Sequence, residues 1–256
     1  MTQTSHAVSR ELGAPIAAGN EAEIFAWGDK VLKLSKRIGD PTQAEHEAAV
    51  LRAVSPLGLG PALEGIIEIE GRWGLVMERV HEPTLASALA DPALLPELLD
   101  LMVSLHRRIH AIAAPEGLPD LKQRLAVRIA RAERLTRELR DDLLARLETM
   151  PEGDRLCHGD FHPFNILGLD AGARVIDWLD ASRGTPAADV CRTYVLAGGY
   201  YPDLARAYLE AYLDEARLDR ATVEAWMPFI AAARLVENVP AEFDRLVQLA
   251  QGRALG

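Results

Sequence analysis

The apolar pattern of this chain changes near Pro83, and this change limits the folds open to it. Before Pro83, short apolar runs alternate with glycine-containing turns, whereas after it apolar residues recur every three or four positions. A period of two is typical of strands and a period near 3.6 is typical of helices. The sequence therefore predicts an α+β, two-lobed fold. A small antiparallel-sheet N-lobe covers residues 1–81, with a hinge near 78–81, and a larger, mostly helical C-lobe covers 82–256.

Two hairpins and one helix are expected in the N-lobe. Segments 23–27 and 30–35 flank the turn Gly28-Asp29, and segment 63–80 turns at Glu70-Gly71. Glycine allows the positive φ that such tight turns need. A short strand is expected over 14–19. Residues 41–55 read as a helix, with Pro41 suited to its first turn.

The C-lobe begins with amphipathic helices over 92–113 and 121–150. The many arginines of the second helix are expected to form its solvent-exposed face. His106 and His110, one helical turn apart, are expected to pack as structural residues. Two short strands follow, "NILGLD" and "RVIDWLD", and then helices to the end. The tyrosines of these last helices are expected in the core, with pocket lining as the alternative.

Charge and composition exclude several classes of function. The chain has 256 residues, a formal net charge of −10 and a pI of about 5.2. An acidic chain disfavours phosphate backbones, so no nucleic-acid partner is expected. No uncharged apolar run is long enough for a membrane helix, and the first residues lack the pattern of a signal peptide. Two cysteines outside a CxxC pair suit a reduced, cytoplasmic setting.

The segment "RLCHGDFHPFNILGLD" carries most of the chemistry. A strand would place His158, Asp160 and His162 on one face, where they could hold a metal ion. However, Gly159 and Pro163 make the segment a loop, and no further histidine or cysteine cluster has ligand spacing. A hydrolytic serine would need a turn such as G-x-S-x-G, which the sequence lacks.

Phosphoryl transfer fits this segment better. It needs an aspartate to accept the hydroxyl proton of the acceptor, and an asparagine five residues later to help hold Mg²⁺. It also needs a second aspartate, at a strand end, to bind the metal. Asp160, Asn165 and Asp177 meet these three requirements in order. The sequence therefore predicts a kinase-type loop.

A lysine that holds the nucleotide phosphates should lie on a strand of the first hairpin and pair with a helix glutamate. Lys33 in "KVLKLS" has that position. Glu47 of the next helix is its expected partner, with Glu45 as the alternative two residues earlier.

These motifs together resemble the aminoglycoside phosphotransferase family. This protein-kinase-like group also contains choline and homoserine kinases. "LCHGDFHPFNIL…VIDWLDASRGTPAADVCR" is similar to the family signature, "GNEAEIFAWGDKVLKL" to its nucleotide-loop hairpin, and "LVMERV" to its hinge. The resemblance covers roughly residues 15–195. It implies ATP, with GTP as the alternative nucleotide, and Mg²⁺ as cofactors.

The resemblance also implies a role for each matching residue. Asp160 would be the catalytic base, and Asn165 and Asp177 the Mg²⁺ ligands. His158 and Asp189 would support the loop. The residues implied to bind the nucleotide are Lys33, Glu47, Gly19, Asn20, Met77, Glu78 and Val80.

The sequence departs from the kinase or family pattern in four respects, and the last two bear on the kind of acceptor. The nucleotide loop has the single glycine Gly19 where protein kinases have G-x-G-x-x-G, and Phe164 stands where the family commonly has glycine. Trp-Leu follows Asp177, and no activation segment precedes the next helix. The acceptor is therefore expected to be a small molecule and not a protein.

The expected function is Mg²⁺-dependent transfer of the ATP γ-phosphoryl group to a hydroxyl. An aminoglycoside-like acceptor, and hence antibiotic resistance, is the leading interpretation. The alternatives are a metabolic acceptor of the amino alcohol, sugar or homoserine type, and a nucleotide-binding protein without turnover. The chain after residue 148 is acidic, which favours a cationic acceptor. Asp180 and Glu237 are the carboxylates expected to bind it. The sequence leaves the oligomeric state open.

Overall fold

The computed structural model describes residues 12–19 and 21–253, which form two compact units. The first unit runs up to Ser87 and also contains Phe164–Leu179. The second consists of Ala88–Pro163 and the chain from Asp180 onward. The first unit therefore includes a segment from the later part of the chain, Phe164–Leu179. A single division near residue 81 would place this segment in the second unit. That division into N-lobe and C-lobe stays a prediction.

The first unit contains a five-stranded antiparallel sheet in the order β1-β2-β3-β5-β4. Its strands are β1 (Ala17–Ala18), β2 (Ala22–Trp27), β3 (Lys30–Ile38), β4 (Leu63–Ile69) and β5 (Arg72–Glu78). Both predicted hairpins are present. Their turns have positive φ at Gly28 (67°), Glu70 (51°) and Gly71 (75°), as tight hairpin turns require.

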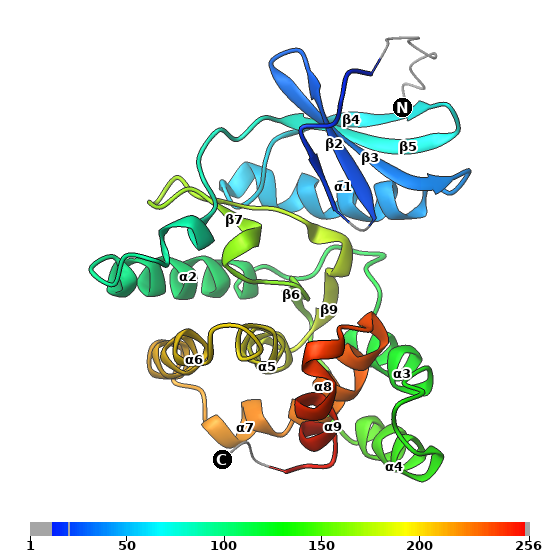
Figure 1. The fold of residues 1–256 in the computed structure, drawn as a ribbon, viewed down its shortest axis with the longest axis vertical. Helices are drawn as coiled ribbons and strands as arrows, with labels where there is room; N and C mark the ends of the chain where they lie inside the picture. Colours follow the sequence, from blue (N-terminus) through cyan, green and yellow to red (C-terminus); the bar gives the residue numbers. More distant parts are fainter. Residues whose placement is uncertain (1–11, 20, 254–256) are drawn as a thin grey trace. The chain divides into compact units, whose positions relative to one another are not determined.

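Helix α1 (Thr42–Val54) packs on one face of this sheet against β4 and β5 (Figure 1). It lies where the sequence predicted a helix, and it buries Ala48, Leu51 and Val54. The opposite face of the sheet has its own apolar cluster around Leu32 and Leu34 of β3. Alternation along β3 therefore turns Lys33, between these two leucines, toward α1.

A small hairpin of β7 (Ile166–Leu167) and β8 (Arg174–Val175) belongs to the first unit as well. The Gly168 amide donates a hydrogen bond to the Pro83 carbonyl (2.9 Å), and the Val175 amide donates to Leu59 (2.7 Å). These backbone bonds fix the segment that carries Asn165 and Asp177 to the sheet-containing unit.

The second unit is mostly helical, as expected. Its helices are α2 (Leu95–His110), α3 (Leu121–Ala130), α4 (Arg137–Glu148), α5 (Pro186–Ala197), α6 (Pro202–Ala216), α7 (Arg220–Glu224), α8 (Met227–Arg234) and α9 (Phe243–Ala250). One short sheet pairs β6 (Arg155–Cys157) with β9 (Ser182–Gly184). Short 3-10 turns cover Leu85–Ala88, Pro163–Asn165, Trp178–Asp180, Leu235–Glu237 and Pro240–Glu242.

The single helix expected over 121–150 is wrong. It is two helices, because α3 ends at Ala130 and α4 begins only at Arg137. Thr136 is the reason for the second start, since its hydroxyl accepts a hydrogen bond from the Leu139 amide. This N-cap satisfies a donor that a continuous helix would pair internally.

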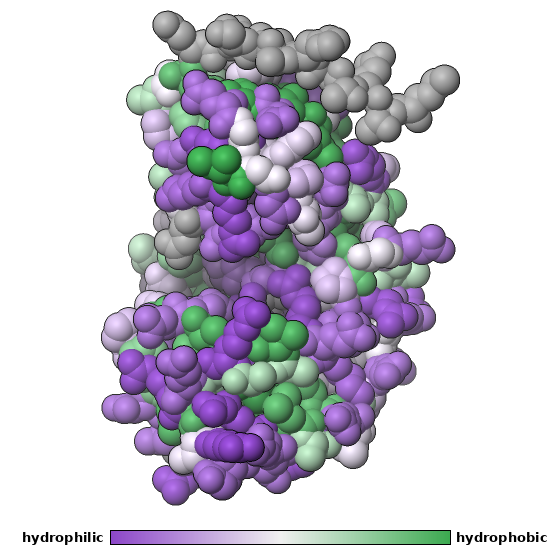
Figure 2. Space-filling view, turned by 90° about the vertical axis from the view of Figure 1, so that its right-hand side faces the viewer, coloured by the Kyte–Doolittle hydropathy of each residue, from purple (hydrophilic) through white to green (hydrophobic). Residues whose placement is uncertain are grey.

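Hydrophilic side chains cover most of the surface seen in Figure 2, with smaller hydrophobic areas between them. Among the described residues, no helix is both long enough and apolar enough to cross a bilayer. The most deeply buried large side chains are in the helical unit and in the segment beside β8. They include Trp178, Trp226, Tyr208, Phe161 and Phe229.

Candidate active site

Lys33 is held between two carboxylates of the first unit. Its Nζ lies 2.7 Å from Glu47 Oε1 and 2.9 Å from Asp177 Oδ1. Burial lowers the pKa of Lys33, but the two carboxylates outweigh burial and leave the pKa above its ordinary value. The lysine is therefore a fixed cation. Glu45, the alternative partner, is exposed on α1.

Glu47 also connects this ion pair to the segment after β8. Its Oε1 accepts a hydrogen bond from the Trp178 amide (3.2 Å) as well as from Lys33. One buried oxygen thus positions both the lysine and the backbone next to Asp177. This geometry predicts that Glu47 acts through Lys33.

We expect Lys33→Ala to raise the KM for ATP and lower kcat, and Glu47→Ala to do so less. The two losses should not add, because residues in one ion-pair network are coupled. Steady-state kinetics of the two single variants and the double variant measure this coupling. Glu45→Ala is the matched control on the same helix and should behave like the parent. Fully additive losses would show that Lys33 and Glu47 act separately.

Asn165 and Asp177 lie at the open end of the β7–β8 hairpin. The Ile176 amide donates to the Asn165 carbonyl (2.9 Å), so the two residues flank one backbone hydrogen bond. Asp177 has φ of 64°, a conformation uncommon for any residue other than glycine. Asp177 keeps 42% of its side chain exposed, whereas Asn165 is buried. Their oxygens suit a hard cation such as Mg²⁺.

The residues expected to bind the nucleotide have different positions in the first unit. Gly19 closes a tight turn, in which its amide donates to Ala22 (2.9 Å) and its carbonyl accepts from Lys36 (2.6 Å). Met77 and Glu78 end β5, and the Glu78 amide already donates to Ala62 (2.8 Å). Val80 follows in the connecting segment, half-buried. Asn20 lies outside the described residues, and these nucleotide contacts stay predictions.

Asp160 belongs to the second unit, in a turn of residues 158–160 that follows β6. Gly159 has φ of 79°, and a Cβ there would lie 2.4 Å from the Asp180 carbonyl oxygen, so only glycine fits. Asp160 Oδ2 lies 3.3 Å from His162 Nε2, and its Oδ1 lies 3.9 Å from the Arg192 guanidinium. Burial raises the pKa of Asp160, but His162 and Arg192 outweigh it and hold the pKa below its ordinary value. The carboxylate is therefore ionised at neutral pH.

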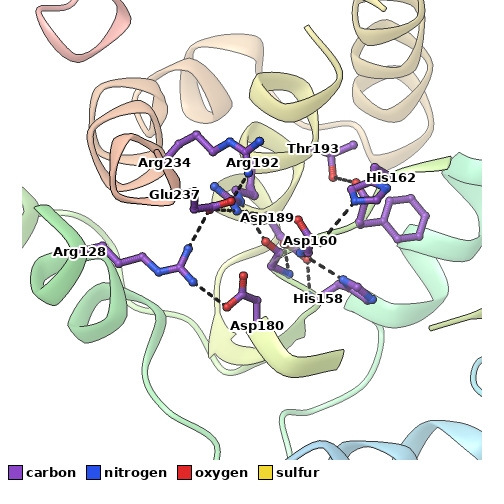
Figure 3. A network of polar contacts seen from close by, with 12 residues as sticks. Arg128, His158, Asp160, His162, Asp180, Asp189, Arg192, Thr193, Arg234 and Glu237 are labelled. Carbon is purple, nitrogen blue, oxygen red and sulfur yellow. Dashed lines mark hydrogen bonds and ion pairs between the residues drawn. The ribbon is translucent and has the colours of Figure 1, made fainter. Parts of the chain in front are cut away.

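Asp189 of α5 holds the backbone of this turn. Its two oxygens accept hydrogen bonds from the amides of His158 (2.6 Å) and Gly159 (2.8 Å), and Asp189 and His158 lie close together in Figure 3. His158 is fully buried, and its Nδ1 lies 3.2 Å from the Asp160 amide. These contacts agree with the supporting roles expected of Asp189 and His158, which stay predictions.

A buried group of histidines and tyrosines completes the surroundings of Asp189. Asp189 Oδ2 lies 3.0 Å from His106 Nε2 and 3.1 Å from His110 Nε2. The other ring nitrogens face Tyr208 (2.5 Å) and Tyr212 (2.6 Å) of α6. Burial and the neighbouring His110 lower the pKa of His106 to about 3, against the opposing effect of Asp189, so His106 is neutral.

These histidines also form, with Asp189, the one group of described residues with metal-ligand proximity. It differs from the set His158, Asp160 and His162 weighed from the sequence. Each of its three side chains already has hydrogen-bond partners within the protein. The arrangement is that of a buried hydrogen-bond network that supports the turn before Asp160.

The two carboxylates expected to meet the acceptor contact arginines instead. Asp180 Oδ1 is paired with Arg124 and lies 2.7 Å from Arg128. Glu237 Oε1 lies 2.6 Å from Arg192 and 3.1 Å from Arg128, and its Oε2 pairs with Arg234 (Figure 3). Guanidiniums contact both oxygens of Glu237, whereas the contacts of Asp180 fall on its Oδ1. Their contact with the acceptor stays a prediction.

Sequence reasoning did not identify these arginines as partners of Asp180 and Glu237. Arg124 and Arg128 were expected on a solvent-exposed face, yet both are partly buried. Arg124 contacts Asp180, and Arg128 contacts Asp180 and Glu237, which lie in the short turns Trp178–Asp180 and Leu235–Glu237. Arg192, next to Asp160, is 7% exposed. The i, i+4 spacing of Arg124 and Arg128 does place them on one helix face. Only tertiary packing decides which way that face turns.

Comparison with known proteins agrees with this geometry. A family model described as the phosphotransferase enzyme family matches residues 13–226. None of the curated proteins matches the chain.

Several solved structures share the fold. A thermostable mutant of aminoglycoside phosphotransferase APH(4)-Ia in its apo form has a TM-score of 0.67 at 19% identity, covering 95% of this chain and 92% of that chain. The same enzyme in a ternary complex with AMP-PNP and hygromycin B has a TM-score of 0.66 at 21% identity, covering 95% and 91%. Choline kinase LicA from Streptococcus pneumoniae has a TM-score of 0.66 at 15% identity, covering 92% and 90%. The predicted two-lobed, protein-kinase-like α+β fold is confirmed.

Proposed function

We propose that this chain, which belongs to the phosphotransferase enzyme family, transfers the γ-phosphoryl group of ATP to a hydroxyl of a small molecule. The observation that supports this most strongly is the Lys33 ammonium, held between Glu47 and Asp177. A fixed cation next to an oxygen ligand for Mg²⁺ is the arrangement that neutralises nucleotide phosphates. GTP is the alternative nucleotide.

The first unit would bind the nucleotide and the metal. Asn165 and Asp177 offer two oxygen donors, a set that Mg²⁺ completes with phosphate oxygens and water. The bound Mg²⁺ would neutralise charge that develops on the phosphates. Lys33 contributes a second positive charge, and its contact with Asp177 Oδ1 (2.9 Å) orients that carboxylate.

The second unit would supply the base. Asp160 is ionised, and its Oδ2 accepts a hydrogen bond from the His162 side chain. A carboxylate with so low a pKa is a weak base, so its main effect is to orient the acceptor hydroxyl and take its proton late in the reaction. His158, Gly159 and Asp189 hold the turn that carries it.

An aminoglycoside and a metabolic alcohol are both acceptors found among proteins of this fold. A structural neighbour was solved with AMP-PNP and hygromycin B, and another is a choline kinase. At 21% and 15% identity these neighbours support the reaction class, while the acceptor has to be read from this chain's own residues. We infer a cytoplasmic location, which the two buried free cysteines and the use of ATP support.

Replacing Asp177 should weaken Mg²⁺-dependent nucleotide binding. We expect Asp177→Ala to reduce the gain in ATP affinity that Mg²⁺ provides by at least about tenfold, as losses at metal sites commonly do. Titration calorimetry with and without Mg²⁺ measures this gain. Asp177→Asn tests the same point while tolerating the positive φ.

Asp170→Ala is the matched control, because Asp170 is exposed in the loop of the same hairpin. It should retain the full effect of Mg²⁺. If Mg²⁺ tightens ATP binding equally in the Asp177 variants and the parent, Asp177 is not a metal ligand.

A further inference from the structure

A small cavity lies beside the turn that carries Asp160, entirely within the second unit. Its volume is about 40 Å³, and Gly159, Arg124, Arg128 and Arg192 line it together with Asp180. That volume holds about three water molecules or one carboxylate-sized group. Apolar side chains of α3 and α8, including Leu125 and Ile230, form the rest of the wall.

The ionisable groups of this wall are mostly positive. Three guanidiniums face two carboxylates, Asp180 and Asp189. Asp189 is already committed, because it accepts hydrogen bonds from two backbone amides and faces two histidines. Asp180 is therefore the one lining carboxylate outside that network, and it contacts two arginines.

The lowered pKa of Arg124 agrees with this excess of positive charge. Burial lowers its pKa, Asp180 opposes that effect, and Arg128 and Arg192 lower the pKa further, so it stays below its ordinary value. Arg192 is different: burial lowers its pKa, but Glu237 and Asp160 outweigh burial and raise it. An added anion near Arg124 would relieve repulsion among the arginines.

Arg128 also has more N–H donors than its two carboxylate partners use. A guanidinium carries five N–H groups, and Arg128 uses one nitrogen for Glu237 and another for Asp180. By contrast, both oxygens of Glu237 are taken by guanidiniums. An anion could join this network without breaking it, whereas an amine would meet three cations.

We propose that the acceptor carries an anionic oxygen group, a carboxylate or a phosphate, which binds Arg124 and Arg128 in this cavity. The proposal rests on the kinase function proposed above and names its substrate class. Arg192 connects the cavity to the base, since its Nε donates to the Gly159 carbonyl (3.0 Å) and its terminal nitrogen lies 3.9 Å from Asp160. Gly159, which lines the cavity, directly precedes Asp160 in the chain, so the cavity adjoins the residue proposed to act on the acceptor hydroxyl.

The test compares acceptors that differ in one group. Glycerol, glycerate and glycerol 3-phosphate form one matched series, and serine with ethanolamine forms a second. We expect kcat/KM of the parent to favour the anionic members by about tenfold or more, the size expected for charge-assisted hydrogen bonds. Rising salt should reduce this preference. Comparing kcat/KM for glycerate with that for glycerol 3-phosphate shows whether the site prefers a carboxylate or a phosphate.

Variants of Arg128 test whether the preference for anionic acceptors arises in this cavity. Arg128→Gln should remove most of the preference, and Arg128→Lys should keep part of it. Arg131→Gln is the matched control with the same change in charge, because Arg131 is exposed at the end of the same helix. A preference for ethanolamine or an aminoglycoside, or an equal preference in Arg128→Gln and the parent, would overturn the proposal.

A binding measurement separates this proposal from the kinase assignment. Glycerate or inorganic phosphate should raise the unfolding temperature of the parent and of Arg131→Gln above that in chloride of equal ionic strength, and Arg128→Gln should lose this rise. If the rise is present but no acceptor yields ADP, the arginine site stands and the kinase function fails. If turnover occurs with neutral acceptors and the rise is absent, the kinase function stands and the anion site fails.

Discussion

Replacing Asp160 with asparagine is expected to lower kcat by about 10²- to 10⁴-fold, the usual contribution of a positioned acid or base. Asparagine keeps the shape of the side chain but loses the negative charge that faces His162 and Arg192. Lys33 and Asp177, the groups proposed to bind the nucleotide and its metal, belong to the other compact unit. The affinity for ATP should therefore change little. Steady-state kinetics and calorimetric ATP titration measure the two effects separately.

Asp141→Asn is the control for this experiment, because Asp141 is an exposed residue of α4 that forms a surface ion pair with Arg137. It removes the same charge and should leave kcat unchanged. Turnover of Asp160→Asn within a few-fold of the parent would take Asp160 out of its proposed role.

The second large effect is expected at Asp189. Its fully buried carboxylate accepts two backbone amides and two histidine N–H groups. An asparagine offers one oxygen and turns an NH₂ group toward donors. We expect Asp189→Asn to lower the free energy of unfolding by about 3 kcal/mol or more, as for other broken buried networks. Urea denaturation measures the loss, and a change below about 1 kcal/mol would contradict the role given to Asp189.

The hydrogen-bond network around Asp189 makes the free energy of unfolding depend on pH. The pKa of Asp189 is held well below its ordinary value by His106 and His110 against the cost of burial. Its stabilising effect is therefore complete above the unfolded pKa near 3.9 and is lost as the pH falls. His106 has a pKa of about 3 when folded and about 6.5 when unfolded, so unfolding takes up a proton between these values. His106 therefore makes the protein less stable as the pH falls below about 6.5. Asp189 adds to this loss only as the pH falls through about 3.9. In Asp189→Asn the Asp189 part of this dependence should be absent.

Local sequence patterns were enough to predict the sheet-containing part of the fold. Gly28 and Gly71 marked the two hairpin turns, and the apolar spacing of residues 41–55 marked α1. Glu47, which the sequence favoured over Glu45, contacts Lys33, and its role in nucleotide binding stays a prediction. These features depend on residues close together in sequence, where turn chemistry and periodicity act directly.

Long-range contacts were harder to predict. The break at Thr136 was missed because the helical spacing of apolar residues continues across it, through Ala132, Leu135 and Leu139. Arg124 and Arg128 meet Asp180 and Glu237 more than 50 residues further along the chain. No local pattern reveals that these arginines face inward, and the expectation of a cationic acceptor followed from total charge instead. The anion site proposed above, which depends on the positions of single charges in the second unit, would favour the opposite charge.

The central claim is phosphoryl transfer to a hydroxyl, and a product balance tests it most directly. The parent protein, ATP, Mg²⁺ and an acceptor panel of hydroxy acids, sugars, amino alcohols and aminoglycosides are incubated together. ADP is quantified while the acceptor is analysed by mass spectrometry. We predict one phosphorylated acceptor for each ADP, dependent on Mg²⁺ and strongly reduced in Asp160→Asn. ADP that forms with free phosphate at a rate independent of every acceptor, or no ADP with any acceptor, would contradict the account.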